Sequence, residues 1–284
     1  MEIDALEPTD LDAALALSRQ AGWNQVRADW RRLLEHPIAW CYAGRVDGGV
    51  VATATVIAYD GRVAWIGMVL VDEAHRRRGY GTALVERALE RATDAADMVG
   101  LDATDAGRPL YRELGFVDAC PVERRVGTLQ PSGDPDREST VPVATVERIA
   151  DASAVLDRDE GWCGIDRRSL LWALVEEPET TTFVADPADP RGYAVLRPGR
   201  VHRQLGPLVA TDRAALSALL DAAAVELGGD SVIVDAVVAG DGETNLLPDR
   251  GLALDRRLTR MSHGCAELLL CGDVVHGAAG LELG

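Results

Sequence analysis

The chain repeats its own residue pattern once, at a nearly constant offset, and this repeat is the strongest constraint on its fold. Leu17–Trp23 reads Leu-Ser-Arg-Gln-Ala-Gly-Trp, and Leu156–Trp162 reads Leu-Asp-Arg-Asp-Glu-Gly-Trp. A similar offset relates 67–71 to 206–210, 101–104 to 234–237, and 115–116 to 251–252. Self-similarity at one period indicates copies of one structural unit. We therefore expect two copies of a single fold.

The boundary between the copies follows from composition. The stretch from Leu129 to Pro142 is rich in Pro, Ser, Gly and Asp, which is typical of a linker. We place the first domain at residues 1–129, the linker at 130–142 and the second domain at 143–284. Each domain is long enough to bury its own core.

The order of elements within one copy predicts an α+β fold. In the first copy, residues 10–36 suit two helices and residues 39–71 suit a meander of strands. A helix, a strand, a second helix and a final strand are expected over 82–127. The crossover helix should make the strand at Val99–Thr104 parallel to its predecessor. We expect a mixed, twisted sheet with helices on both faces.

The first copy holds a strand–turn–helix that is suited to an anion. An apolar run, Trp65–Val71, enters a basic turn with Gly79 and Gly81, and a helix follows from near Thr82. This helix has an apolar stripe at Leu84, Val85, Ala88, Leu89 and Ala92. Such a turn aims successive N–H groups into one cup, and the helix dipole favours negative charge there. The glycines allow close approach of a ligand, so the pattern predicts a phosphate or pyrophosphate site.

The turn is neither of two common phosphate motifs. The dinucleotide fingerprint would need a third glycine, and the P-loop needs a lysine, which this chain lacks. Instead Val71, Arg76, Gly79 and Gly81 match Val-x-x-x-x-Arg-x-x-Gly-x-Gly, which resembles the acetyl-CoA motif of the GNAT (GCN5-related) N-acetyltransferase superfamily. Tyr111–Phe116, Tyr-Arg-Glu-Leu-Gly-Phe, resembles the family's Tyr-x-x-x-Gly-Phe segment. The resemblance covers roughly residues 1–127.

The resemblance implies a fold, a co-substrate and a set of site residues. It implies two tandem GNAT-like domains, the first of which binds acetyl-CoA between splayed strands. The pyrophosphate would lie on the amides of Arg77 to Thr82, and the pantetheine arm would pair with Val69 and Val71. A backbone N–H near Met68–Leu70 would stabilise the oxyanion. The implied cofactor-binding residues are Val69, Leu70, Val71, Arg76, Arg77, Arg78, Gly79, Tyr80, Gly81 and Thr82.

The second copy lacks these features. Ala210–Leu216 goes almost directly into its helix without the glycines of the turn, and Leu247 stands where Tyr111 would be. We therefore expect one active site, in the first domain, and a degenerate second domain. That domain either walls off the acceptor pocket or only stabilises the first.

The reaction needs two proton transfers. Tyr111 is the candidate acid for the departing thiolate, because its family counterpart often has this role and a phenol has a pKa near 10. The alternative is a packed tyrosine whose hydroxyl caps a neighbour. For the base, the sequence leaves several carboxylates and histidines open, and none stands out: Glu35, His36, Asp60, His75 and Asp102. Trp23 and Trp30 are expected in the core rather than in the acceptor pocket.

Composition limits the partners. The formal charge is −17 and all 29 basic residues are arginine, which argues against general nucleic-acid binding. The lysine-free, acidic composition suits a salt-adapted cytoplasm or reflects a biased genome. No apolar stretch is long enough for a transmembrane helix, and an acidic N-terminus is unlike a secretory signal. We expect a cytoplasmic protein that does not bind a membrane.

Five cysteines occur without a CxxC pair or a disulfide framework, and we expect reduced, mostly buried thiols. Cys265 and Cys271 lie near two histidines, His263 and His276, but the spacing matches no standard zinc site, so we expect no metal.

Three functions remain open at this point. The first is an acetyl-CoA-dependent N-acetyltransferase that acts on a small-molecule amine by direct attack in a ternary complex. The second is a regulatory module that binds coenzyme A without turnover. The third is acetylation of a protein N-terminus or lysine. The sequence leaves the oligomeric state open.

Overall fold

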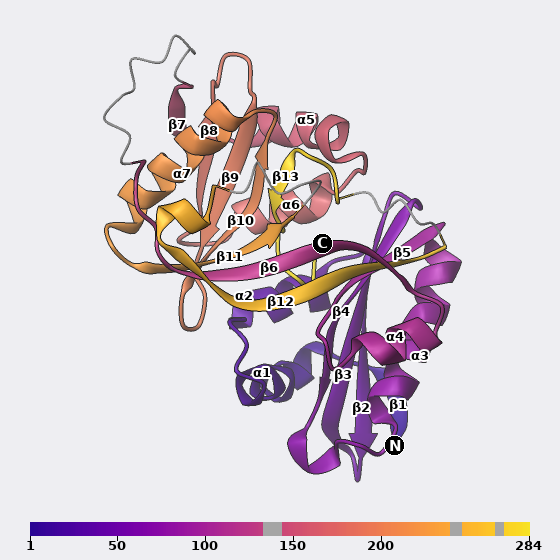
Figure 1. Ribbon diagram of the computed structural model, residues 1–284. Helices are drawn as coiled ribbons and strands as arrows, with labels where there is room; N and C mark the ends of the chain where they lie inside the picture. The colour runs from indigo at the N-terminus through magenta and orange to yellow at the C-terminus, as the bar shows by residue number, and fades with distance from the viewer. Residues whose placement is uncertain (133–143, 239–245, 265–269) are drawn as a thin grey trace.

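The computed structural model describes residues 1–132, 144–238, 246–264 and 270–284 (Figure 1). Most of the linker expected at 130–142, and Cys265, lie outside the described residues.

The first half of the chain has the predicted order of elements. The short 3-10 helices are η1 (Pro8–Asp10) and η2 (Glu73–His75). The α-helices are α1 (Leu11–Gln20), α2 (Arg27–Glu35), α3 (Tyr80–Ala95) and α4 (Arg108–Glu113). The strands are β1 (Glu2–Ala5), β2 (Ala39–Val46), β3 (Gly49–Tyr59), β4 (Val63–Val71), β5 (Met98–Ala103) and β6 (Val117–Thr128).

The second half repeats this order. Its helices are α5 (Ser153–Cys163), α6 (Arg168–Val175), α7 (Arg213–Leu227) and the 3-10 helix η3 (Pro248–Arg250). Its strands are β7 (Val146–Ile149), β8 (Thr181–Ala185), β9 (Gly192–Arg197), β10 (Arg203–Ala210), β11 (Ser231–Val237), β12 (Leu252–His263) and β13 (Val275–Gly277). The expected α+β fold with a mixed sheet is confirmed.

The strands of the described residues form one 13-stranded sheet, in which the two halves exchange their last long strands. The order is β1-β2-β3-β4-β5-β12-β6-β11-β13-β10-β9-β8-β7. Strand β12 pairs antiparallel with β5 of the first half, from Thr259 opposite Ala103 to His263 opposite Val99. Strand β6 pairs with β11 of the second half, and β6 and β12 pair with each other across the molecule (Figure 1). This exchange was not predicted from the sequence.

Strands β4 and β5 start as a parallel pair and then separate. Their register runs from Val63 opposite Met98 to Trp65 opposite Gly100, and among the described strands no pairing joins them beyond that point. On its other side, β4 carries a bulge, because Met68 and Val69 together oppose one residue of β3. Met68 has φ of 48°, and the Thr53 hydroxyl donates to the Met68 carbonyl at 2.8 Å. The edge of β4 that faces β5 is therefore unpaired with a described strand from Ile66 to the end of β4.

The corresponding pair in the second half, β10 and β11, is filled by the chain itself. The two strands pair in parallel only at Arg203–Val232 and Gln204–Ile233. Beyond these residues β13 lies between them, with Gly277 opposite both Leu208 of β10 and Ala236 of β11. The main-chain groups at this separation thus have a strand partner within the protein.

Helices cover both faces of the sheet. Helices α3 and α7 pack against β3–β4 and β8–β10 respectively, over two separate apolar cores. On the opposite face, α1 and α2 of the first half share one core with α5 and α6 of the second. The predicted apolar stripe of α3 is buried at Leu84, Val85, Ala88 and Ala92, and Leu89 is partly buried.

A buried ionic network joins the halves beside this shared core. Arg32 of α2 donates to Glu177 from Nε at 2.9 Å and from Nη2 at 2.7 Å. Arg197 of β9 donates to Asp29 of α2 at 2.9 Å, and Arg32 lies 3.2 Å from Asp29. Removing one partner from such a network leaves a buried charge uncompensated, so the network fixes how the halves meet.

The cysteines differ in part from the expectation. Cys41 and Cys163 are free and buried, as predicted. The prediction of reduced thiols is wrong for Cys120 and Cys271, which form a disulfide with Cα atoms 6.3 Å apart. The sequence could not indicate this pair, because 151 residues separate the two cysteines and only the fold brings them together. Among the described residues, no helix has the length and apolarity needed to cross a bilayer.

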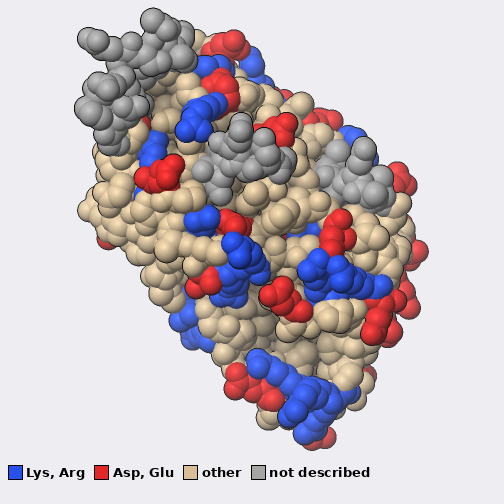
Figure 2. Space-filling view, viewed as in Figure 1, with Lys and Arg blue, Asp and Glu red and all other residues tan. Residues whose placement is uncertain are grey.

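Opposite charges are mixed over one face of the molecule (Figure 2). On the face drawn in Figure 2, basic and acidic side chains lie next to one another, and the described residues there form no broad area of one sign. Arg45, for example, pairs with both Asp4 and Asp10. The arginines thus offset the acidic charge locally.

Gly100 is expected to be indispensable where β4 and β5 separate. A Cβ atom at this position would overlap the ring of Trp65, which is fully buried. We expect Gly100→Ala to lower the free energy of unfolding by about 1–3 kcal/mol through overpacking, measured by urea denaturation. Gly161→Ala is the control, because its Cβ would meet open space on helix α5 and it should be neutral or stabilising. Equal stability of both variants would contradict the role given to Trp65.

Candidate functional site

The turn between β4 and α3 presents unused main-chain donors. Helix α3 begins at Tyr80, two residues before the expected start, and its N-cap Gly79 is left-handed with φ of 79°. In the described part of the chain, the N–H groups of residues 77–82 donate to no other group. The space beside Gly79 is open within 4 Å, and the only close neighbour of a Cβ at Gly81 would be Val71 at 3.5 Å. The turn can therefore accept an anion on its N–H groups.

The three arginines of the turn differ in their contacts. Arg76 donates from Nε to the Val71 carbonyl at 3.1 Å and lies 3.6 Å from Glu73. Arg77 and Arg78 are exposed, and Arg77 has φ of 60°. Arg76 thus ties the turn to the end of β4, and the other two add positive charge at its surface.

The equivalent turn of the second half is closed to an anion. Helix α7 has Asp212 as its N-cap, and the Asp212 carboxylate accepts the N–H of Ala215 at 2.9 Å. A carboxylate at a helix N-terminus already supplies the negative charge that the dipole favours. A phosphate at this turn would meet that charge.

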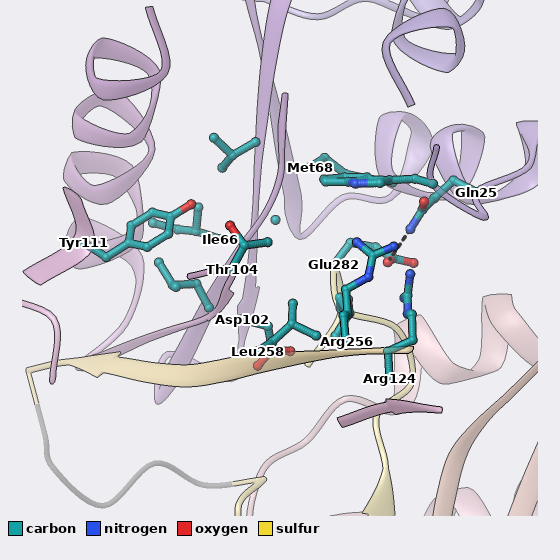
Figure 3. A pocket seen from close by; sticks show the side chains of 15 residues that line it. Gln25, Ile66, Met68, Asp102, Thr104, Tyr111, Arg124, Arg256, Leu258 and Glu282 are labelled. Atoms are coloured by element: carbon teal, nitrogen blue, oxygen red, sulfur yellow. Dashed lines mark hydrogen bonds between the residues drawn. The ribbon is translucent and has the colours of Figure 1, made fainter. Parts of the chain in front are cut away.

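A cavity of about 150 Å³ lies where β4 and β5 separate (Figure 3). The bulged segment of β4, from Ile66 to Val69, forms one wall. Residues of β5 and α4 form a second wall, namely Leu101, Asp102 and Tyr111. The second half contributes Arg256 and Leu258 from β12, and Leu281 and Glu282 from the C-terminal segment. The two halves therefore build this cavity together.

Tyr111 lies at one end of the cavity with its hydroxyl directed inward (Figure 3). Its ring packs edge-on against Phe116 at 6.0 Å between centroids. Among the described residues, the hydroxyl makes no hydrogen bond, so Tyr111 does not cap a neighbour. Burial raises the pKa of Tyr111 to about 12. The phenol therefore stays protonated and available as a donor at neutral pH.

The other end of the cavity is polar. Four polar side chains extend toward it (Figure 3). They are Gln25 from the segment before α2, Arg124 from β6, Arg256 from β12 and Glu282 from the C-terminal segment. Gln25 donates to Glu282 at 3.1 Å. Arg124 is held by Asp235 through two hydrogen bonds of 2.7 and 2.9 Å. The cavity thus has a hydroxyl at one end and charged groups at the other.

The five candidate general bases differ in their contacts and in their distance from the cavity. Asp102 lines the cavity, but Arg260 donates to both of its oxygens at 2.9 Å. His75 contacts Asp72 at 2.9 Å, and Asp60 accepts the N–H of Asp166. Glu35, His36, Asp60 and His75 do not line the cavity. Burial raises the pKa of Asp102, but Arg260 occupies both of its oxygens, so the carboxylate is not free to approach an amine. None of the five is therefore well placed to act as the base.

Two tryptophans differ in their surroundings. Trp30 is fully buried and donates from Nε1 to Ser18, which confirms its predicted place in the core. Trp23 is only half-buried, packs against the core and also lines the cavity.

Three cavity residues that were not predicted from the sequence come from distant segments of the chain. Gln25 and Glu282 are 257 residues apart, and Arg256 belongs to the exchanged strand. One signal was present: Glu282 is the single charged residue of the apolar segment Gly-Leu-Glu-Leu-Gly at 280–284. A lone carboxylate in such a segment is buried only for a specific reason.

Three described residues near the C-terminus, His263, Cys271 and His276, have separate surroundings. His263 contacts Phe116, Cys271 is in the disulfide, and His276 lies 3.2 Å from the Ala210 carbonyl. In the described ranges, no group of three His, Cys, Asp or Glu side chains is arranged to hold a metal ion.

Comparison with known proteins gives one family for both halves. A model described as the acetyltransferase (GNAT) family matches residues 7–116, and one described as the acetyltransferase (GNAT) domain matches residues 155–270. Together these matches span more than half of the chain.

Three individual proteins are similar to this chain. Uncharacterized N-acetyltransferase YitH of Bacillus subtilis (strain 168) is 29% identical over 123 residues, which is 43% of each chain. The chain thus spans less than half of that relative. Holothin acyltransferase of Pseudoalteromonas sp. (strain SANK 73390) is 26% identical over 85% of this chain and 81% of its own length. The crystal structure of a putative acetyltransferase from Pyrococcus horikoshii aligns with a TM-score of 0.81 and 22% identity, over 100% of this chain and 95% of that one. At this identity the alignment supports the fold alone.

Alkaline titration should show that Tyr111 is an unusually weak acid. Its pKa of about 12 lies above the ordinary value of about 10. Folding therefore favours the neutral phenol, and this contribution to stability is present below about pH 10 and lost as the pH rises through about 12. The increase in phenolate absorbance with pH should therefore be the same in the wild type and in Tyr111→Phe up to about pH 10. Loss of one phenolate from the ordinary range in the variant would contradict the burial of the hydroxyl.

Proposed function

Because the chain belongs to the GNAT acetyltransferase family, with two GNAT domains in tandem, we propose that it transfers the acetyl group of acetyl-CoA to the primary amine of a small molecule. The family supplies the coarser statement: an acyl-CoA co-substrate and an amine acceptor. The acetyl group, the kind of acceptor and the residues that act are our proposal.

One observation carries the proposal, namely the contrast between the two halves. The first half offers free N–H groups at residues 77–82 and an unpaired β4 edge that leads directly to them. In the second half Asp212 occupies the turn and β13 fills the separation of the strands. A single co-substrate would therefore bind in the first half, and the second half would be degenerate.

The co-substrate fits the first half in two places. The diphosphate would accept hydrogen bonds from the N–H groups between Arg77 and Thr82, with Gly79 and Gly81 leaving room for it. The amides of the pantetheine arm would pair with the open edge of β4 at Val69 and Val71, as an added strand would. A buried N–H at the bulge near Met68–Leu70 would then face the thioester carbonyl and stabilise its negative charge.

The chain's residues then act on two groups. The nitrogen of the acceptor loses one proton, forms a bond to the thioester carbonyl carbon, and the carbon–sulfur bond breaks. Tyr111 donates its proton to the departing sulfur and takes the second proton of the nitrogen, so that the phenol is restored. With a pKa of about 12 it is a weaker acid than a thiol at about 8.5. Because burial makes Tyr111 a weak acid, the phenol would not ionise before the reaction. It would donate a hydrogen bond to the sulfur and pass its proton on as it takes one from the nitrogen.

The enclosure of the cavity favours a small acceptor. Arg256, Leu258 and Glu282 from the second half line it, and its volume is about 150 Å³. A protein lysine needs an open groove, which these walls restrict. Release of free thiol from acetyl-CoA with a panel of primary amines tests the activity, whereas binding of acetyl-CoA with no release for any amine would favour a regulatory module.

A negative charge placed in the turn should weaken binding of the co-substrate. Gly79→Glu sets a carboxylate against the diphosphate, and we expect acetyl-CoA to bind at least about tenfold more weakly, a change of about 1.4 kcal/mol. Isothermal titration measures this affinity. Gly228→Glu is the matched control, because Gly228 is also left-handed, with φ of 57°, and also faces open space. Unchanged affinity in Gly79→Glu would remove the turn from the site.

Loss of the Tyr111 hydroxyl should slow turnover without weakening co-substrate binding. We expect Tyr111→Phe to lower kcat by about 10²-fold or more, the usual contribution of a positioned proton donor. Tyr42→Phe is the control, because Tyr42 is also buried but does not line the cavity. Wild-type turnover in Tyr111→Phe would end its proposed role.

A further inference from the structure

Among the described residues, two hydrogen-bond acceptors at the polar end of the cavity have no donor. Glu282 is 3% exposed, and its Oε2 accepts from Gln25 Nε2 at 3.1 Å. Its Oε1 is buried without a hydrogen-bond partner, and so is Gln25 Oε1. Because a carboxylate only accepts, the Gln25 amide gives its nitrogen to Glu282 and leaves its oxygen free. Buried acceptors without donors are rare and call for an explanation.

The charges around Glu282 do not balance. The network between the halves contains two cations, Arg32 and Arg197, and three carboxylates, Asp29, Glu177 and Glu282. Arg32 donates to Asp29 and Glu177, and Arg197 donates to Asp29 and to the Ala279 carbonyl. Arg197 lies 3.9 Å from Glu282 Oε1, too far for a hydrogen bond. The ion pairs of Arg124 with Asp235 and of Arg256 with Asp255 add no net charge. One negative charge therefore remains over at Glu282, and this favours a cation in the cavity.

The segment that carries Glu282 is firmly held. Tyr59 donates from its hydroxyl to the Leu283 carbonyl at 2.6 Å, and Trp65 Nε1 donates to the Leu281 carbonyl at 3.0 Å. The Glu282 backbone lies against Gly67, next to the bulge of β4. The carboxylate is thus fixed beside the strand at which the thioester carbonyl is proposed to lie.

We propose that Glu282 and Gln25 bind the ammonium group of the acceptor, and that Glu282 is the catalytic residue that takes its proton. An ammonium group has three N–H donors, and two of them would satisfy the two free acceptors. Its positive charge would offset the charge left over in the network. This inference rests on the proposed function, because it assigns one step of that reaction.

The proton balance is simple. Glu282 as carboxylate takes one proton from the R–NH₃⁺ acceptor, which leaves R–NH₂ with the lone pair needed for attack. After the C–N bond has formed and the C–S bond has broken, the protonated Glu282 releases this proton to water. The second nitrogen proton goes to the sulfur by way of Tyr111, so that the products are the amide and free thiol.

Burial supports this role. It raises the pKa of the Glu282 carboxyl, and the charge of Asp29 raises it further, whereas Arg197 and Arg32 oppose the shift. A general base works best when its pKa is close to the working pH. The titratable and charged groups that face Glu282 are Asp29, Arg32, Tyr59, Arg124, Arg197 and Arg256.

Stability provides the first test. Glu282→Gln removes an uncompensated buried charge with almost no change in shape, so its Tm at neutral pH should equal or exceed that of the wild type. Glu177→Gln is the control, because Glu177 belongs to the same network but accepts two hydrogen bonds from Arg32, and this variant should have a lower Tm. A clearly lower Tm for Glu282→Gln would make Glu282 a structural partner of Arg197 and overturn the proposal.

Kinetics with benzylamine and aniline provides the second test. Benzylamine is charged at neutral pH and must lose a proton, whereas aniline is already neutral. We expect Glu282→Gln to lower kcat/KM for benzylamine by about 10²-fold or more and to affect aniline far less. The wild-type rate with benzylamine should fall as the pH drops through the raised pKa of Glu282, and the variant should lack this limb. Equal losses for both amines would overturn the proposal.

Binding separates this inference from the proposed function. Glu282→Gln should bind acetyl-CoA as the wild type does. With free coenzyme A bound, which cannot acetylate the amine, benzylamine should raise the Tm of the wild type only. Equal effects of benzylamine on both proteins would overturn the role of Glu282. Failure of the proposed function looks different, because the wild type would then release no thiol with either amine.

Discussion

The structure depends on the main-chain pairing of β12 with both β5 and β6. This exchange gives β5 an antiparallel partner along one edge. Strand β5 therefore stays in the sheet where its other edge is no longer paired with β4. It also fuses the sheets of both halves into one. After Trp65, β5 stays paired with β12 and β4 stays paired with β3, while β4 and β5 are no longer paired with each other. The cavity lies in this separation.

The C-terminal segment has a different use in each half. Its first part, β13, fills the gap between β10 and β11 in the second half. Its last residues lie against the open strand of the first half and bring Glu282 into the cavity. One short piece of chain thus occupies one strand separation and lines the other. Two similar domains therefore differ in whether the separation between their central strands is filled by a strand.

Local signals in the sequence predicted much of this arrangement. The glycines and arginines of residues 76–82 and the stripe on α3 are local patterns, and they indicated the turn, the helix and the family. The repeat indicated two domains. The strand exchange and the disulfide could not be predicted, because pairing partners such as Thr259 and Ala103 carry no mark of each other. The same holds for Gln25 and Glu282, which only the fold brings together. Tyr111 was found from its motif, but its raised pKa comes from burial, which the motif does not encode.

The strand exchange has a consequence for the order in which the protein can be made. Residues 117–128 leave the ribosome well before β11 and β12, their two neighbours in the sheet. During this time the outer edge of β5 is also unpaired, since residues 252–263 have not yet been synthesised. The first half therefore cannot acquire the strand pairing of the finished protein before the second half has been synthesised. It must wait for the second half, and a ribosome that stalls between α5 and α7 would leave two exposed strand edges for chaperones to cover.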